Sequence, residues 1–225
     1  MKRIVAVFFA LLLLSVPTLR VSALSNVYMK NENAVKKVAL TFDDGPHPIY
    51  TPRILDILEK YGVKATFFVI GQNVENYPEA FEALSKSENE IGNHTYDHKN
   101  VGRMSEERVR EEITKTEQAI KEHSGRHSFL LRPPEGSLGD PLRRVSVEAG
   151  YDIILWSIDT LDWAHTPSQK IARDVLSSVG DGDIILMHDY VSHGSTTCDA
   201  LEIMIPKMLE MGYEFVTVTE LICEE

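Results

Sequence analysis

The chain has 225 residues, of which 34 are acidic and 23 are lysine or arginine, so that its formal net charge is −11. An acidic balance of this size disfavours binding to nucleic acid and other polyanions. The length suits one α/β domain with a complete hydrophobic core, and two cysteines, Cys198 and Cys223, are too few for a disulfide scaffold or a cysteine-built zinc site. These cysteines either form one bridge or stay as free thiols.

The N-terminus has the pattern of a secretory signal peptide. Lys2 and Arg3 precede an apolar run over residues 4–16, and small residues follow at 21–23. The apolar run is shorter than the roughly 20 residues that a membrane-spanning helix needs. We therefore expect a signal peptide over residues 1–23 and a protein that is secreted or associated with the cell wall, with no stable membrane span after cleavage. An uncleaved membrane anchor is the alternative.

The remaining chain alternates strand and helix patterns. Residues 24–36 are mostly polar and are expected to form a lead-in segment to one domain over residues 37–222. Short apolar and β-branched runs predict seven strands, at residues 38–42, 65–70, 90–93, 129–131, 153–158, 183–187 and 214–218. Helical patterns lie between them, at residues 51–61, 78–87, 105–123, 142–149, 167–178 and 200–211. This alternation predicts a parallel sheet with right-handed crossovers.

Polar clusters follow most of the expected strands. In a closed β/α barrel all strand ends open onto one face, which is where such folds place their active sites. An open doubly wound sheet would bring fewer of these clusters together. The sequence therefore favours a single-domain α/β barrel.

Two carboxylates, Asp43 and Asp44, end the first expected strand. Neighbouring residues that leave a strand point to opposite sides, so the two can take different roles. His94 and His98 are four residues apart, a spacing that places both imidazoles on one side of a helical turn. With Asp44 they supply two nitrogens and one oxygen, which predicts a divalent metal site with a position open for water or substrate. Zinc suits this ligand set, and cobalt, nickel or manganese are alternatives.

Five ordered motifs carry a resemblance to a known family. They are Thr-Phe-Asp-Asp-Gly-Pro at 41–46, the two histidines, Arg-Pro-Pro at 132–134, Asp-Thr-Leu-Asp-Trp at 159–163 and Leu-Met-His at 186–188. Their order resembles that of the polysaccharide deacetylases, the NodB-homology domain of carbohydrate esterase family 4. The resemblance covers essentially the whole chain after the signal segment. It implies a distorted (β/α)7 barrel and a hydrolase that removes N-acetyl groups from the amino sugars of a polysaccharide.

The resemblance also implies roles by position. Asp43 would be the general base, held ionised by Arg132, and His188 would be the general acid, oriented by Asp162. Trp163 and Leu186 would line the pocket for the acetyl methyl group. The full set of expected substrate-binding residues is Trp163, Leu186, Pro134 and Glu135.

Glu135 departs from the family pattern. Many members have tyrosine at this position, and its backbone N–H is thought to help bind the oxyanion, a donor that survives a change of side chain. A carboxylate would repel acidic substituents and could accept hydrogen bonds from sugar hydroxyls. We therefore expect Glu135 to tune substrate choice. The alternative is that it points into solvent.

The substrate favoured by these features is peptidoglycan, acted on by a small exported monomer, with chitin oligomers and acetylxylan as alternatives. Two other classes of function are alternatives. One is a glycan-binding protein without catalysis, and the other is a metal-dependent amidase that acts on something other than sugar. A binding protein needs neither a base, an acid nor the residues that orient them, so the sequence favours an enzyme.

Overall fold

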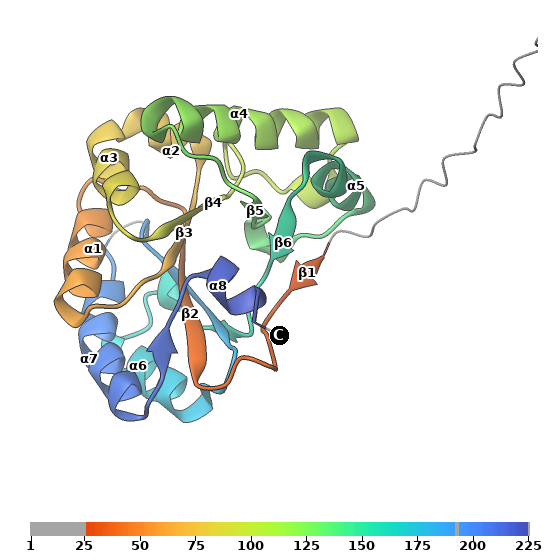
Figure 1. Cartoon of the computed structure of the whole chain (residues 1–225). Helices are drawn as coiled ribbons and strands as arrows, with labels where there is room; N and C mark the ends of the chain where they lie inside the picture. Colours follow the sequence, from red (N-terminus) through yellow and green to blue (C-terminus); the bar gives the residue numbers. More distant parts are fainter. Residues whose placement is uncertain (1–25, 192–193, 225) are drawn as a thin grey trace, which may run out of the picture.

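Parallel strands form the centre of the protein, and helices lie around their outer side (Figure 1). The computed structural model describes residues 26–191 and 194–224, so the expected signal peptide lies outside the described residues. Within the described part, no helix has the length and apolar character needed to cross a membrane.

The elements follow one another in chain order. The strands are β1 (Val27–Tyr28), β2 (Lys37–Asp43), β3 (Thr66–Val69), β4 (Glu90–Asn93), β5 (Leu130–Leu131), β6 (Asp152–Ile154), β7 (Ile158–Asp159), β8 (Ile184–His188) and β9 (Glu214–Phe215). The α-helices are α1 (Tyr50–Tyr61), α2 (Gly71–Asn76), α3 (Pro78–Lys86), α4 (Glu106–Ser124), α5 (Asp140–Ala149), α6 (Ser168–Ser178), α7 (Thr197–Glu210) and α8 (Val218–Ile222). Short 3-10 turns are η1 (Val101–Arg103), η2 (Pro134–Gly136) and η3 (Asp162–Ala164).

The strands are ordered β1-β6-β5-β4-β3-β2-β8-β7, with β9 paired to β2. The expected strand at 153–158 is in fact two strands, β6 and β7, which pair near opposite ends of this order. Between them, Leu155 N donates to Tyr28 O at 2.8 Å and Ser157 N donates to Ile184 O at 3.0 Å. The segment thus leaves one end of the sheet and joins the other. The sheet is curled, as in a distorted barrel, and the predicted α/β barrel class is confirmed.

Three local features differ from the expected elements. The polar lead-in contains β1, which pairs with β6, and α2 follows β3 where no helix was expected. The expected last strand ends early, because Thr217 is the N-cap of α8. Its side chain accepts a hydrogen bond from Glu220 N, and the Glu220 carboxylate accepts one from Thr217 N, which is a capping box.

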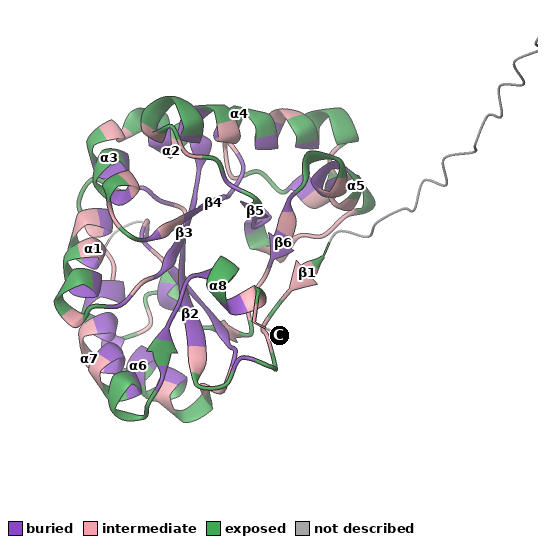
Figure 2. Ribbon diagram, in the orientation of Figure 1, coloured by how far each residue is buried: buried purple, intermediate pink, exposed green. Residues whose placement is uncertain are grey.

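The core lies on both sides of the central strands, which are buried along most of their length (Figure 2). Six of the seven residues of β2 are buried, and so are all four of β3. The rings of Phe42 and Phe67 pack with their centroids 4.9 Å apart. A strand held this closely gives the polar residues at its carboxyl end a fixed position.

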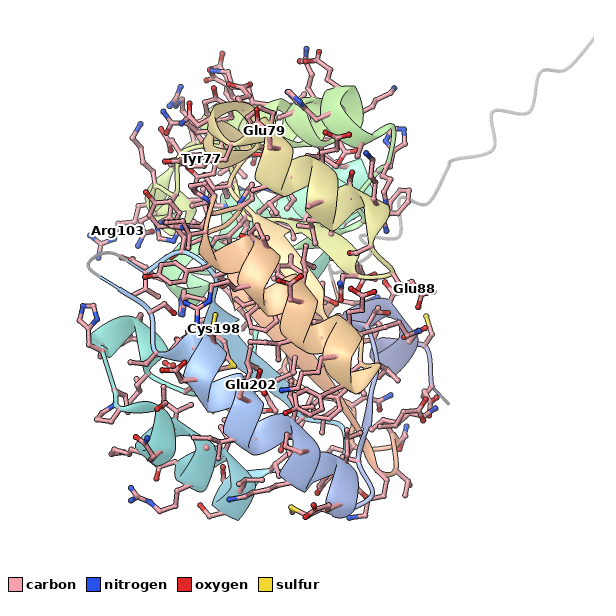
Figure 3. All side chains as sticks on the ribbon, turned by 90° about the vertical axis from the view of Figure 1, so that its left-hand side faces the viewer. Tyr77, Glu79, Glu88, Arg103, Cys198 and Glu202 are labelled. Carbon is pink, nitrogen blue, oxygen red and sulfur yellow. The ribbon has the colours of Figure 1, made fainter. Side chains whose placement is uncertain are left out.

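Helices α1 and α7 lie side by side on the outer surface (Figure 3). The Glu202 carboxylate of α7 accepts a hydrogen bond from Tyr61 Oη at 2.7 Å, which joins the two helices near the end of α1. Cys198, also on α7, is buried, whereas Cys223 is exposed, and both are free thiols. The structure therefore contains no disulfide bridge between Cys198 and Cys223, and the alternative of free thiols is the one observed.

Candidate active site

Polar side chains gather at the carboxyl ends of the parallel strands. Asp43 is the last residue of β2, and the sheet register pairs it directly with His188, the last residue of β8. Paired residues on neighbouring strands project to the same side of a sheet. The two residues expected to transfer protons therefore lie on one side of the strand ends.

Three side chains have the arrangement of metal ligands. One ligand atom from each of Asp44, His94 and His98 lies within 4.8 Å of the others. Asp44 Oδ1 is buried without a hydrogen-bond partner, 3.4 Å from His94 Nε2 and 3.1 Å from His98 Nε2. His94 Nδ1 lies 2.8 Å from the carbonyl oxygen of Arg132, which can only accept, so Nδ1 carries the proton and Nε2 presents a lone pair. These converging lone pairs fit a divalent cation.

The electrostatics of Asp44 agree with this fit. Burial alone would raise the pKa of Asp44, but its contacts with His94 and His98 hold that pKa well below its usual range. The contact with Asp44 in turn raises the pKa of His98, against the effect of burial. Asp44 is thus ionised at neutral pH, as a metal ligand must be.

The two histidines do not lie on a helical turn, and that part of the prediction is wrong. The segment after β4 is a loop in which Thr95 and His98 have left-handed backbone conformations, with φ of 68° and 57°. The left-handed turns bring the two imidazoles together, with ring centroids 5.1 Å apart. The spacing of four residues therefore gives the expected proximity through a different backbone path.

Arg132 is completely buried and holds Asp43 in place. Its Nη1 donates to Asp43 Oδ1 at 2.8 Å and to Thr41 Oγ1 at 2.7 Å. Its Nε and Nη2 donate to the carbonyl oxygens of Ile154 and Leu155 at 3.2 and 2.9 Å. Burial lowers the pKa of Arg132 and the Asp43 carboxylate opposes that shift. The guanidinium is therefore a fixed charge whose donors are satisfied, and it orients the Asp43 carboxylate through a charge-assisted hydrogen bond.

Asp162 organises His188 in a similar way. The Asp162 side chain is buried and accepts from His188 Nδ1 and His188 N, both at 2.8 Å, from Thr197 Oγ1 at 2.7 Å and from Trp163 N at 2.9 Å. Burial alone would lower the pKa of His188. The hydrogen bond and charge of Asp162, followed by the charges of Asp43 and Asp44, raise it to about 9. With Nδ1 committed to Asp162, Nε2 is the atom that can exchange a proton with a substrate.

The expected substrate-binding residues occupy different environments. Leu186 is buried on β8, two residues before His188 and therefore on the same side of the strand. Trp163 follows Asp162 and is 53% exposed, so it is available for contact and is not a core residue. Pro134 is buried, whereas Glu135 is exposed, with φ of 58° and a carboxylate that accepts from Asn100 Nδ2 at 2.7 Å.

Asp189 is a further residue of the site that the motifs do not include. It is fully buried, its Oδ2 accepts from Thr51 Oγ1, and its Oδ1 has no hydrogen-bond partner. Burial raises its pKa to about 7. A Cβ at Gly45 would lie 2.1 Å from Asp189 Oδ2, so only glycine fits the turn after the two aspartates. The sequence signal that could have identified Asp189 is its position directly after His188.

A curled parallel β/α sheet, with candidate base, acid and metal ligands at its strand ends, defines a barrel-type hydrolase. The chain belongs to the polysaccharide deacetylase family, whose family model matches residues 30–154. A peptidoglycan-N-acetylglucosamine deacetylase of Bacillus cereus is 38% identical over 192 residues, covering 84% of this chain and 90% of that protein.

Solved structures agree with this assignment. A crystal structure of a peptidoglycan N-acetylglucosamine deacetylase superposes with a TM-score of 0.84 at 35% identity, covering 88% of this chain and 92% of the other. A structure described as a family 4 pseudoenzyme from Bacillus anthracis gives a TM-score of 0.83 at 32% identity, covering 89% of this chain and 70% of the other. Overall fold therefore does not separate active from inactive relatives, and the side chains of the site carry the functional argument.

Proposed function

We propose that this protein is a metal-dependent deacetylase that removes N-acetyl groups from the amino sugars of peptidoglycan. The observation that supports the proposal is that three residues that could hold a metal ion lie on one face with Asp43 and His188, and each of these two side chains contacts its own buried partner. A glycan-binding protein has no use for either of these pairs. The similarity to peptidoglycan deacetylases supports the choice of polymer.

The chemistry divides among the residues by their contacts. A divalent cation held by Asp44, His94 and His98 would supply Lewis-acid chemistry at the acetamide carbonyl. Asp43, held in place by Arg132, would take a proton from the attacking water. Nε2 of His188 would give a proton to the leaving nitrogen. Nδ1 would keep its own proton, which it donates in a hydrogen bond to Asp162. Water and the N-acetyl group are thereby converted into acetate and a free amine.

Zinc is the cation that best suits two imidazoles and one carboxylate, and cobalt, nickel or manganese could occupy the same ligands. The measurement is metal analysis of the purified protein together with activity after removal of metal and replacement by each cation. Activity that survives complete removal of metal would contradict the metal-dependent part of the proposal.

The protein is proposed to act outside the cytoplasmic membrane, since the charged start and short apolar run at residues 1–16 are typical of export signals. Mass spectrometry of the exported protein tests this part. A mature form that begins near residue 24 is expected. A membrane-bound form that retains residues 1–23 would show an anchor instead.

The substrate is tested by acetate release from peptidoglycan, chitin oligomers and acetylxylan, each with and without a chelator. Peptidoglycan is expected to give the highest kcat/KM. Binding to glycans without acetate release would favour the glycan-binding protein, and hydrolysis of non-sugar amides alone would favour a different amidase.

A further inference from the structure

The loop that carries His94 and His98 has an unfavourable backbone conformation, which needs contacts with the surrounding structure to be stable. Left-handed conformations are unfavourable for residues other than glycine, and this loop has two of them, at Thr95 and His98. Such a loop persists only where its surroundings fix it. Part of this support comes from α2, whose first N–H groups, those of Gly71 and Gln72, donate to loop carbonyl oxygens at 3.0 and 2.9 Å.

The N–H groups at the centre of the loop are held by a single side chain. Glu112, on α4, is 2% exposed, and its Oε2 accepts from Tyr96 N at 3.0 Å and from Asp97 N at 3.2 Å. The nearest cation, Arg108, lies 3.6 Å from Oε1, is about half exposed and donates to Glu111 at 2.5 Å. Oε2 of Glu112 is therefore directed at the loop, whereas Oε1 faces the more distant Arg108.

The two histidines depend on this support unequally. His94 has its own anchors, because its N donates to Val69 O at 2.9 Å and its Nδ1 donates to Arg132 O at 2.8 Å. In the described part of the chain His98 makes no comparable hydrogen bond, and its Nε2 approaches Asp44 Oδ1 at 3.1 Å. The position of His98 is consequently set by the loop that precedes it.

We propose that Glu112 is a positioning residue of the metal site, which fixes the loop so that His98 completes the ligand set with Asp44 and His94. The inference rests on the proposed metal-dependent function. Glu112 does not touch the ligand atoms and acts through the two backbone N–H groups. Residues that orient metal ligands in this way typically account for about 10- to 100-fold in metal affinity.

The test is a metal titration of the mature protein and three variants, using zinc in competition with a chromophoric chelator and the visible spectrum of the cobalt-loaded protein. Glu112→Met keeps the size of the side chain but removes both acceptor oxygens, and it should weaken zinc binding about 10- to 100-fold and alter the cobalt spectrum. Glu112→Gln keeps an acceptor oxygen and should restore tight binding. Glu111→Gln, on the exposed side of the same helix, is the matched control and should bind as the unmodified protein does.

Zinc binding by Glu112→Met that equals the unmodified protein would overturn the proposal, and so would a loss in Glu112→Gln as large as in Glu112→Met. If Glu112→Met does not fold, amide hydrogen exchange in the unmodified protein decides. Slow exchange at Tyr96 and Asp97 is expected, and exchange as fast as in an unprotected loop would overturn the inference. Absence of zinc and cobalt binding in the unmodified protein would instead overturn the proposed function, and the inference with it.

Discussion

Replacing Asp162 with asparagine should lower the pKa of His188. The two Asp162 oxygens accept four hydrogen bonds, two of them from His188 itself, at Nδ1 and at the backbone N. Asparagine has one oxygen and one NH2 group, so one end of the side chain must face donors. If the NH2 group faces His188 Nδ1, that nitrogen must accept a hydrogen bond, and the imidazole cannot become doubly protonated. If the NH2 group faces His188 N instead, the backbone N–H of His188 loses its acceptor and is left unpaired.

The expected size of the effect follows from the charge that is lost. His188 has a pKa of about 9 against an ordinary value of 6.5, although its burial acts in the opposite direction. Without the Asp162 charge, the pKa in the metal-free protein should fall to 6.5 or below. The difference of about 2.5 pH units corresponds to about 3 kcal/mol. At pH 7.5 the protonated fraction of His188 in the metal-free protein would fall about tenfold. In the zinc-loaded protein kcat should fall on the order of 10²-fold because a positioned acid is lost.

The same shift makes stability depend on pH. Because the pKa of His188 is higher in the folded protein than in the unfolded chain, the pair with Asp162 stabilises the metal-free protein fully below about pH 6.5, and this contribution is lost as the pH rises through about 9. Urea denaturation of the metal-free protein should therefore show a decline of about 3 kcal/mol over this window. In Asp162→Asn that decline should be absent.

The assay is an NMR titration of the His188 imidazole in the metal-free protein, compared with the variant. Asp159→Asn is a matched control, because Asp159 belongs to the same motif but is exposed and does not contact His188. In the Asp159→Asn variant, the pKa of His188 should match that in the unmodified protein. A His188 pKa that stays near 9 in Asp162→Asn would refute this reasoning.

Three further substitutions test separate parts of the site. Asp43→Asn should keep bound zinc but lose on the order of 10²-fold or more in kcat, and full activity would remove Asp43 from the role of base. Arg132→Met leaves the Asp43 carboxylate buried without its partner and should cost about 3–5 kcal/mol in the free energy of unfolding. An unchanged urea midpoint would contradict that ion pair. Glu135→Tyr should change the ratio of kcat/KM between peptidoglycan and chitin oligomers at equal metal content, and a constant ratio would show that Glu135 is not a selectivity residue.

The strand ends could be predicted from the sequence because local signals mark them. The apolar, β-branched run before Asp43 is interrupted by a turn, and the resemblance then supplied roles for the polar residues behind it. Residues 153–158, by contrast, form a continuous run of mostly apolar residues that gives no sign of a break. The division into β6 and β7 arises because the two halves pair at opposite ends of the sheet, and long-range pairing leaves no local pattern.

The support of the site was harder to predict than its ligands. The last strand was predicted to extend to residue 218 because Val216, Thr217 and Val218 are β-branched, which favours a strand. The capping box between Thr217 and Glu220 instead starts a helix there. Glu112 could have been noticed as a charge on the apolar side of a predicted helix, beside Ile113. Its partners, however, are backbone N–H groups of a distant loop, which only the folded structure identifies.

The central claim is that one site combines a bound cation with a separate base and acid. It is tested most directly by acetate release from peptidoglycan with the metal-depleted mature protein, before and after addition of zinc, alongside Asp43→Asn treated in the same way. The account predicts that zinc restores activity to the unmodified protein, while Asp43→Asn binds the same amount of zinc and stays on the order of 10²-fold slower. Equal activity of the two zinc-loaded proteins, or full activity of the unmodified protein without metal, would contradict it.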